Sequence, residues 1–364
     1  MAKYRQALLM AEEDLGPAGT KVLNIDIDKP ISRLNIRFNA TKVLGYDTAG
    51  PPGNIPKIEL VDGSTVLHSL SGFQNQALAY YSRPPGSMMD IGLHIATLPT
   101  VDFFALDFGR FLWDEQLAFL AKHFDNPQLK ITFDENVGDT STSVNACEVW
   151  ADIFDEKSIS PMGFLSAVEH YAYTAGAVNS YEQLELPEDR LIRQILVRAF
   201  LDGHEPYYNI QSIRMDEGTL DKIPFEFANL EYYFYRMMGT WPKIVTDFQA
   251  DMTNAARVFY LPQSNYGATI TGIFHDTEQR AYRNDGIWPL PGGKASIIAT
   301  GAAQYIGQAF GYLPWSTFQF PMGKQMDLND WYDPAGKKPR LRVRAGAAAA
   351  NPAVQVILEE LYPY

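Results

Sequence analysis

The 364-residue chain has little cysteine, little histidine and few positive charges. Cys147 is its only cysteine, so no intrachain disulfide can form, and we expect a buried strand thiol in a reducing cytosol. The formal net charge of −13 argues against a protein whose main task is wrapping nucleic acid. No signal peptide is visible at the start, and the most apolar long stretch, residues 295–313, is too rich in small and polar residues for a membrane span.

Short catalytic and nucleotide-binding motifs are also missing. There is no Gly-x-Gly-x-x-Gly or Gly-x-Ser-x-Gly, and GGKA at 292–295 lacks the hydroxyl that a phosphate-binding loop places after its lysine. His94 and His275 are candidates for a lone metal ligand, but ordinary polar positions are the favoured interpretation. No histidine pair has metal-ligand spacing among the six: His68, His94, His123, His170, His204 and His275. Sequence alone cannot select an acidic pair, so we assign no catalytic, cofactor-binding or metal-binding residue.

Aromatic residues and turn formers are abundant and favour β structure. The chain has 20 Tyr, 21 Phe, 27 Gly and 23 Pro. Runs such as RLNIRFNA (33–40) and PQLKITF (127–133) alternate apolar and polar residues, which predicts half-buried strands. We expect short helices over residues 5–15, 74–81 and 114–124, a helical piece within 159–180, and a larger helical crossing over 223–238. Asp327 is predicted to cap a polar helical turn, and Asp333 to precede Pro334 in a turn.

One phrase occurs twice, as NIPKIELVDGST at 54–65 and NIQSIRMDEGT at 209–219. Its identical residues lie 155 positions apart: Asn54 and Asn209, Ile55 and Ile210, Ile58 and Ile213, Gly63 and Gly218. Later matches follow in the same order. PQLKITF (127–133) aligns with PRLRVRA (339–345) at an offset of 212, and VNACEVWADIF (144–154) aligns with VQVILEELY (354–362) at 210. The sequence therefore predicts a duplicated unit, with 57 extra residues (212 − 155) in its second copy.

The pattern predicts an all-β protein with short helices, built as two tandem jelly-roll β-sandwiches, because the helices are too few for a parallel α/β sheet. We place an N-terminal arm or helix at residues 1–19 and the first jelly roll at 20–157. A connector follows at 158–180. The second jelly roll, with longer loop insertions, occupies residues 181–364.

Two segments are candidate contact surfaces. In the basic run KKPRLRVR (337–344), Arg340, Arg342 and Arg344 share one face of a predicted strand. That face either contacts nucleic acid, lipid headgroups or an acidic neighbour, or is a solvated or edge-protecting strand face. The aromatics of LEYYFYRMM (230–238) either stack on bases or sugars or, as the favoured interpretation, belong to the core or to a subunit interface.

A family resemblance rests on FFALDFGRFLWDEQLAFLAKHFDNPQLKITF (103–133), read as a strand, a short helix and a second strand at residues 101–111, 114–124 and 127–133. ACEVWADIF (146–154) is similar to the strand that closes a first roll. With this order of elements and its tandem rolls over residues 20–364, the chain resembles the double jelly-roll major capsid proteins of tailless icosahedral viruses, including phages with an internal membrane. The resemblance implies a double jelly roll with no enzymatic activity and no cofactor.

The resemblance also implies partners and a location. It implies pseudo-hexameric homotrimers that contact neighbouring capsomers and tile an icosahedral shell, together with minor capsid or vertex proteins. The N-terminal arm would point inward toward a membrane or the genome, and no small-molecule substrate is expected. The chain would be made in the host cytoplasm and end in the virion.

Two alternatives stay open at this point. One is a secreted or intracellular carbohydrate-binding or carbohydrate-active double β-sandwich, which exposed tryptophans would favour among Trp113, Trp241, Trp288, Trp315 and Trp331. The other is a receptor-binding or spike module of a virus, which would form a slender trimer without lattice contacts.

Overall fold

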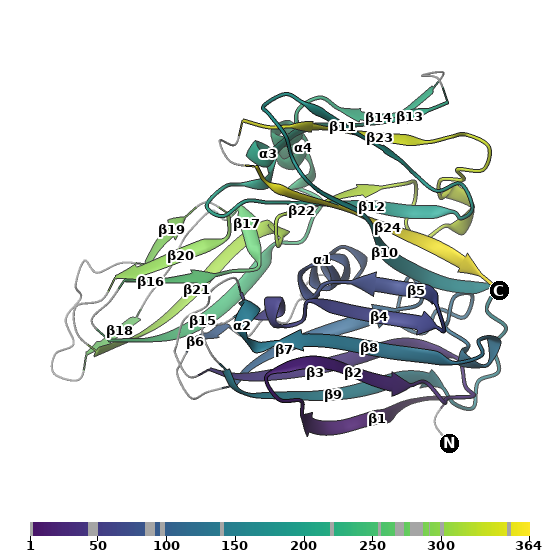
Figure 1. Cartoon of the computed structure of the whole chain (residues 1–364), viewed down its shortest axis with the longest axis horizontal. Coiled ribbons are helices and arrows are strands. Elements are labelled where there is room, and N and C mark those ends of the chain that lie inside the picture. Colours follow the sequence, from purple (N-terminus) through teal and green to yellow (C-terminus); the bar gives the residue numbers. More distant parts are fainter. Residues whose placement is uncertain are drawn as a thin grey trace.

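The computed structural model describes residues 3–42, 50–83, 92–94, 99–138, 142–218, 222–253, 256–265, 273–276, 287–290, 292–298, 302–347 and 351–364. The first part of the chain forms a β-sandwich (Figure 1). Its strands are β1 (Tyr4–Asp14), β2 (Ala18–Asn24), β3 (Ile31–Lys42), β4 (Lys57–Asp62), β5 (Thr65–Leu70), β7 (Pro99–Asp107), β8 (Pro127–Asp134) and β9 (Thr142–Phe154). Its helical segments are η1 (Pro51–Asn54), α1 (Gly72–Ser82), η2 (Ala121–His123) and α2 (Glu135–Gly138).

This first roll has two four-strand layers, in the orders β1-β9-β3-β7 and β2-β8-β4-β5. Side chains alternate between core and outer face, as β8 shows with its strictly alternating buried and half-buried positions. The inward residues of both layers form one apolar cluster that includes Phe38, Phe104 and Phe119. Burial of this cluster holds the two layers together.

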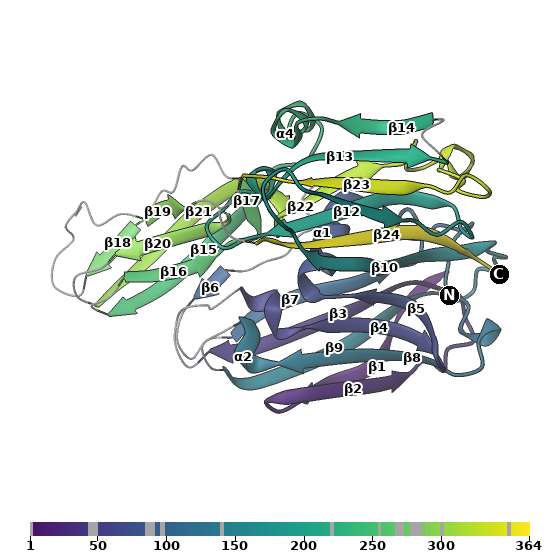
Figure 2. The ribbon, with the colours of Figure 1, turned by 45° about the horizontal axis from the view of Figure 1, so that its top comes forward.

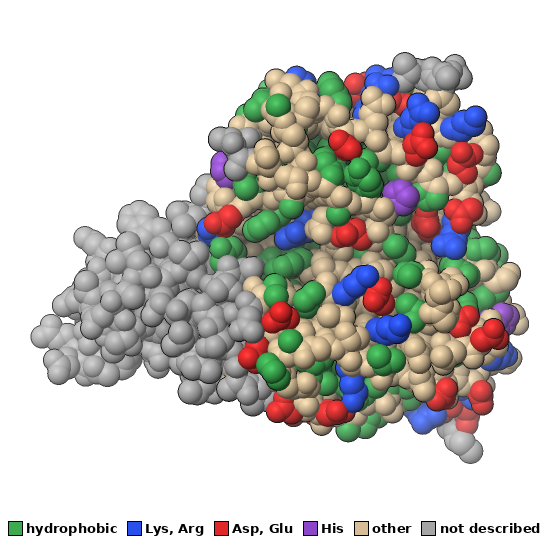
Figure 3. Space-filling view, in the orientation of Figure 1, with side chains coloured by type: hydrophobic (Ala, Val, Ile, Leu, Met, Phe, Trp, Pro, Cys, Tyr) green, Lys and Arg blue, Asp and Glu red, His purple; other side chains and the backbone are tan. Residues whose placement is uncertain are grey.

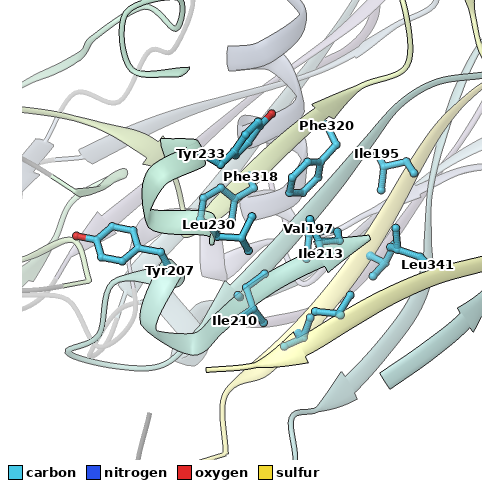
Figure 4. Close-up of a cluster of buried hydrophobic side chains, with 14 of the residues drawn as sticks. Ile195, Val197, Tyr207, Ile210, Ile213, Leu230, Tyr233, Phe318, Phe320 and Leu341 are labelled. Atoms are coloured by element: carbon cyan, nitrogen blue, oxygen red, sulfur yellow. The ribbon is translucent and has the colours of Figure 1, made fainter. Parts of the chain in front are cut away.

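The second roll repeats this architecture. Its strands are β10 (Gly163–Thr174), β11 (Tyr181–Glu185), β12 (Ile192–Phe200), β13 (Ile210–Glu217), β14 (Lys222–Phe227), β22 (Thr317–Pro321), β23 (Arg340–Ala345) and β24 (Ala353–Pro363). Its helical segments are α3 (Pro206–Asn209), α4 (Leu230–Met237) and η3 (Leu328–Asp330). The layers run β10-β24-β12-β22 and β11-β23-β13-β14 and enclose a separate core, shown in Figure 4.

The two rolls share strand order and also two of their irregularities. In both, the third strand carries a bulge against the last strand, between Ile31 and Arg33 in β3 and between Ile192 and Gln194 in β12. The first strand of each roll has a matching bulge, between Leu8 and Met10 in β1 and between Glu169 and Tyr171 in β10. Because bulges are positional features of a fold, this agreement supports the duplication that the repeated phrase predicted. The chain is a double jelly roll, as predicted.

The repeated phrase encodes a helical turn, a strand and a tight turn. Asn54 ends η1, which leads into β4, and Asn209 ends α3, which leads into β13. Both asparagine side chains are buried. Each strand is followed directly by a glycine, Gly63 after β4 and Gly218 after β13, and both glycines have φ of 57°. This left-handed conformation favours glycine over any residue with a Cβ, which explains why both copies keep it.

The extra length of the second roll lies at one point of the fold. Residues 83–98 link α1 to β7, whereas residues 238–316 link α4 to β22. The latter contain β15 (Ile244–Thr253), β16 (Ala256–Tyr260), β17 (Gln263–Asn265), β18 (Ile273–Asp276), β19 (Ile287–Leu290), β20 (Lys294–Ile298) and β21 (Ala302–Pro314). These strands, joined by β6 (Gly92–His94) through a parallel pairing with β15, form the projecting sheets at the left of Figure 1. Where described, this segment consists mainly of paired strands and not of the loops predicted.

Three predicted helices are wrong. Residues 5–15 form most of β1, which pairs with β9, so this part of the expected N-terminal arm belongs to the first sheet. Residues 114–124 contain only η2, because the backbone of Phe119 pairs with that of Ile31 and must be extended there. The predicted connector contains β10, which pairs with β24 along its whole length. In each case pairing with a distant strand overrides local helix propensity.

The other helix predictions have mixed outcomes. The helix predicted over 74–81 is α1, and its N-cap Ser71 forms a capping box with Gln74. The crossing predicted over 223–238 is divided between β14 and α4. Asp327 caps η3 by accepting a hydrogen bond from the Asn329 amide at 3.1 Å, as predicted. In the described part of the chain, no helix has the length and apolar character that a membrane crossing needs.

Candidate assembly surfaces

The histidines do not form a site in the described structure. His68 is buried at the junction of the rolls, and burial lowers its pKa to about 4. His123 packs against the ring of Tyr364, and His170 contacts the carbonyl of Glu185 at 2.9 Å. His94 and His275 lie in β6 and β18, but their side chains are outside the described residues, so neither lone-ligand candidate is tested. No group of potential metal ligands occurs among the described side chains.

The basic run forms β23, which lies between β11 and β13. It is therefore a central strand, and the edge position considered from the sequence is wrong. Leu341 and Val343 point into the core, and the three arginines face outward as predicted. Each arginine has a partner in the same chain: Arg340 Nη2–Glu185 Oε1 at 3.3 Å, Arg342 Nε–Asp216 Oδ2 at 2.9 Å, and Arg344 Nη2–Asn179 Oδ1 at 2.7 Å.

This internal pairing favours a solvated sheet face over an open anion-binding site, because Arg340 and Arg342 each face a carboxylate of the same chain, and Arg344 donates a hydrogen bond to a neutral amide. Figure 3 agrees with this interpretation: blue and red side chains lie side by side near the upper edge of the molecule, over the region of β13, β14 and β23.

Most of the described tryptophans are buried. Trp241, Trp315 and Trp331 are 5–7% exposed, and Trp113 is half-buried with its ring 4.5 Å from that of Tyr4. The side chain of Trp288 lies outside the described residues. The exposed tryptophans that would favour sugar binding are therefore not found in the described part of the chain.

The aromatics of α4 divide by helix face. Tyr233 and Phe234 point into the core of the second roll, as Figure 4 shows for Tyr233. Tyr232 and Tyr235 are 71% and 54% exposed, and Arg236 next to them is also exposed. Residues at i, i+3 and i+4 share one helix face, so α4 presents a surface of two tyrosines and an arginine. We call this set, Tyr232, Tyr235 and Arg236, the α4 face.

The equivalent helix of the first roll, α1, has no exposed residue, because it lies between the two rolls. Gln74 donates a hydrogen bond to Glu169 of β10, and Tyr81 Oη donates to the carbonyl of Thr317 in β22 at 2.7 Å. Leu78 joins an apolar cluster with three residues of the second roll: Ala167, Leu196 and Ile357. One face of the sheet β10-β24-β12-β22 is therefore the docking surface for α1.

The rolls are also joined by their backbones. Strand β5 pairs in parallel with β10, so layers of both rolls form one eight-strand sheet, β2-β8-β4-β5-β10-β24-β12-β22. Beside this joint, Arg193 and Glu359 form an ion pair of 2.8 Å with both side chains at most 3% exposed. Ser82 at the end of α1 accepts a hydrogen bond from Gln194 at 3.0 Å. The junction is thus both apolar and polar.

Among the described residues, no helix covers the outer face of β1-β9-β3-β7 as α1 covers the second roll. This face carries a hollow of 540 Å³ whose lining includes Gln6, Asn35, Phe103, Trp113 and Trp150. Leu8 and Phe103 are 49% and 36% exposed on this sheet. We call this surface the β1–β9 face.

Sequence reasoning named the α4 segment but missed the β1–β9 face. The residues of the β1–β9 face alternate with core residues along each strand. This two-residue alternation shows that their side chains point outward, but it does not show what they contact. A usable signal was the apolar character of Leu8 and Trp150 at outward positions, but residues 5–15 were assigned to a helix.

Comparison with known proteins identifies the fold. No protein-family profile matches the chain, and no curated protein sequence matches it. Among solved structures, the major capsid protein of Sulfolobus turreted icosahedral virus matches with a TM-score of 0.61 at 9% identity, over 100% of this chain and 98% of that chain. The major capsid protein P2 of bacteriophage PM2 matches with a TM-score of 0.53 at 8% identity, over 99% of this chain and 98% of that chain.

A third match is VP54 of PBCV-1, with a TM-score of 0.54 at 9% identity, over 98% of this chain and 93% of that chain. At these identities the likeness concerns the fold and extends over nearly the whole chain. The chain has the double jelly-roll fold found in these major capsid proteins.

Proposed function

We propose that the chain is a major capsid protein that assembles as pseudo-hexameric homotrimers and tiles an icosahedral virion shell. The observation that carries this proposal is the pair of matching rolls standing side by side in one chain. Three such chains supply six similar walls, and a head-to-tail contact between copies closes into a ring. The full-length likeness to solved capsid proteins supports the same role.

In this role the chain is a structural protein without enzymatic activity or cofactor. Its partners are other copies of itself, in the trimer and in neighbouring capsomers, and its place is the virion after synthesis in the host cytoplasm. Contacts with minor capsid or vertex proteins, and of the N-terminal segment with a membrane or the genome, stay predictions. No specific observation favours the carbohydrate-binding alternative.

The test is the assembly state of the purified chain. Size-exclusion chromatography with light scattering is expected to give three times the monomer mass, and negative-stain microscopy six-cornered particles that form sheets or shells. A chain that stays monomeric at all concentrations, or a monomer retained on a glycan column, contradicts the proposal.

A further inference from the structure

The duplication allows the covered helix α1 to be compared with the uncovered helix α4. Their N-caps are Ser71 and Asn229. Counting from these caps, Tyr232 of α4 occupies the position of Gln74 in α1, and Arg236 that of Leu78. Gln74 and Leu78 are side chains through which α1 contacts the second roll. The α4 face is therefore the repeat of a surface that is an interface elsewhere in the same chain.

The surface that receives α1 also has a repeat. In the second roll, Ile357 pairs across the strands with Glu169 on one side and Leu196 on the other. In the first roll, Trp150 pairs in the same way with Leu8 and Asn35. The matching bulges keep the two rows in register. The row Leu8–Trp150–Asn35 is thus the repeat of Glu169–Ile357–Leu196, and it lies on the β1–β9 face.

We propose that the α4 face of one copy docks on the β1–β9 face of a second copy, as α1 docks on the second roll within the chain. This inference rests on the proposed homotrimer and names its contact. Tyr232 packs on Leu8, and Arg236 lies over the ring of Trp150. The two faces lie at opposite ends of the molecule, with α4 at the top and β1 at the bottom of Figure 1, so one chain cannot satisfy the contact by itself.

The chemistry of the two faces is complementary. Leu8 and Tyr232 are exposed apolar and aromatic side chains that the contact would bury. Arg236 already lies over two aromatic rings of its own roll, at 5.5 Å from Phe227 and 5.6 Å from Tyr233, which holds its guanidinium on the surface. An arginine over a tryptophan face gains a cation–π attraction. Aromatic and arginine side chains are also the residues that dominate protein interfaces.

A cross-linking experiment tests the contact directly. The variant Leu8→Cys/Tyr232→Cys is expected to give covalent dimers and trimers on a non-reducing gel after mild oxidation of the assembled protein. Cys147 is buried and does not compete. The matched control is Leu8→Cys/Tyr181→Cys, since Tyr181 is 59% exposed on β11. Cross-linking of the test pair above the control supports the contact, and none above the control in an assembled trimer overturns it.

Substitutions give a second readout. Tyr232→Ala and Arg236→Glu are each expected to raise the concentration at which trimers dissociate by at least ~10-fold. Tyr181→Ala is expected to leave that concentration unchanged, and circular dichroism should show native folding for all three. If trimers form and neither α4 variant weakens them, the inference fails and the proposed function stands. If the unmodified chain is monomeric, the proposed function fails as well.

Discussion

The buried ion pair at the junction of the rolls provides a quantitative test of the structure. Arg193 Nη1 lies 2.8 Å from Glu359 Oε2, and the two side chains are 3% and 2% exposed. Gln194 Nε2 donates to the same carboxylate oxygen at 2.5 Å. The substitution Arg193→Met keeps an apolar stem of similar length but leaves the carboxylate of Glu359 buried without its counter-charge.

The expected loss follows from desolvation. Removing one partner of a buried ion pair costs about 3–5 kcal/mol, because the other charge stays buried without compensation. At about 2.1 cal/mol/K of unfolding entropy per residue, a cooperative transition of the 364-residue chain would shift its melting temperature by about 4–7 °C. The double variant Arg193→Met/Glu359→Leu removes both charges and should recover most of the loss, since apolar replacement of a buried pair is often neutral.

The assay is thermal unfolding followed by circular dichroism, with Arg5→Met as the matched control. Arg5 pairs with Asp155 at 3.0 Å, but its side chain is 57% exposed. An exposed pair contributes at most about 1 kcal/mol, so this variant should melt within roughly 1–2 °C of the unmodified protein. The reasoning is refuted if Arg193→Met is no more destabilising than Arg5→Met, or if the double variant is worse than Arg193→Met alone.

Three further predictions concern single residues. Burial raises the pKa of Glu205 to about 8, so the contribution of Glu205 to the free energy of unfolding should fall as pH rises from about 4.5 to 8. Glu205→Gln should remove this part of the pH dependence when melting temperatures are compared at pH 5 and pH 8.5. Gly63 has φ of 57°, so Gly63→Ala should cost about 1 kcal/mol in denaturant unfolding, and Gly63→Asn less. Burial raises the pKa of the Cys147 thiol to about 12, so a thiol reagent should label it only after unfolding, and rapid labelling of folded protein would contradict its burial.

The sequence predicted the elements whose pattern is set by their own residues. Strands β3, β8 and β23 alternate clearly, and α1 has an N-cap with a matching capping box. The repeated phrase was informative because each part of it has a local cause: a buried Asn after a helical turn, an alternating strand, and a glycine in the left-handed region.

The misassigned elements are those whose conformation depends on a distant partner. Residues 5–15 are rich in Ala, Leu, Met and Glu, which favour helices, but pairing with β9 makes them a strand. In the candidate site, Tyr232 and Tyr233 are neighbours of the same type, and only the phase of α4 exposes one and buries the other. Whether the outer face of a helix or sheet is covered depends on its contact with another roll, and the local sequence pattern does not indicate that contact.

In the proposed trimer, the place of the insertion would let two rolls of unequal size serve as equivalent walls. An insertion within a wall strand would shift its register and turn core side chains outward. The connection between the helix and the next strand of the wall carries no such constraint. Residues 238–316 enter there, after α4 and before β22, and their strands build the projecting sheets beside the roll. The eight strands of the second roll keep the order of the first and share two of its bulges. In the proposed trimer, the six walls would therefore stay alike where copies meet. The added sheets would make the second roll of each chain differ from the first only where these sheets project.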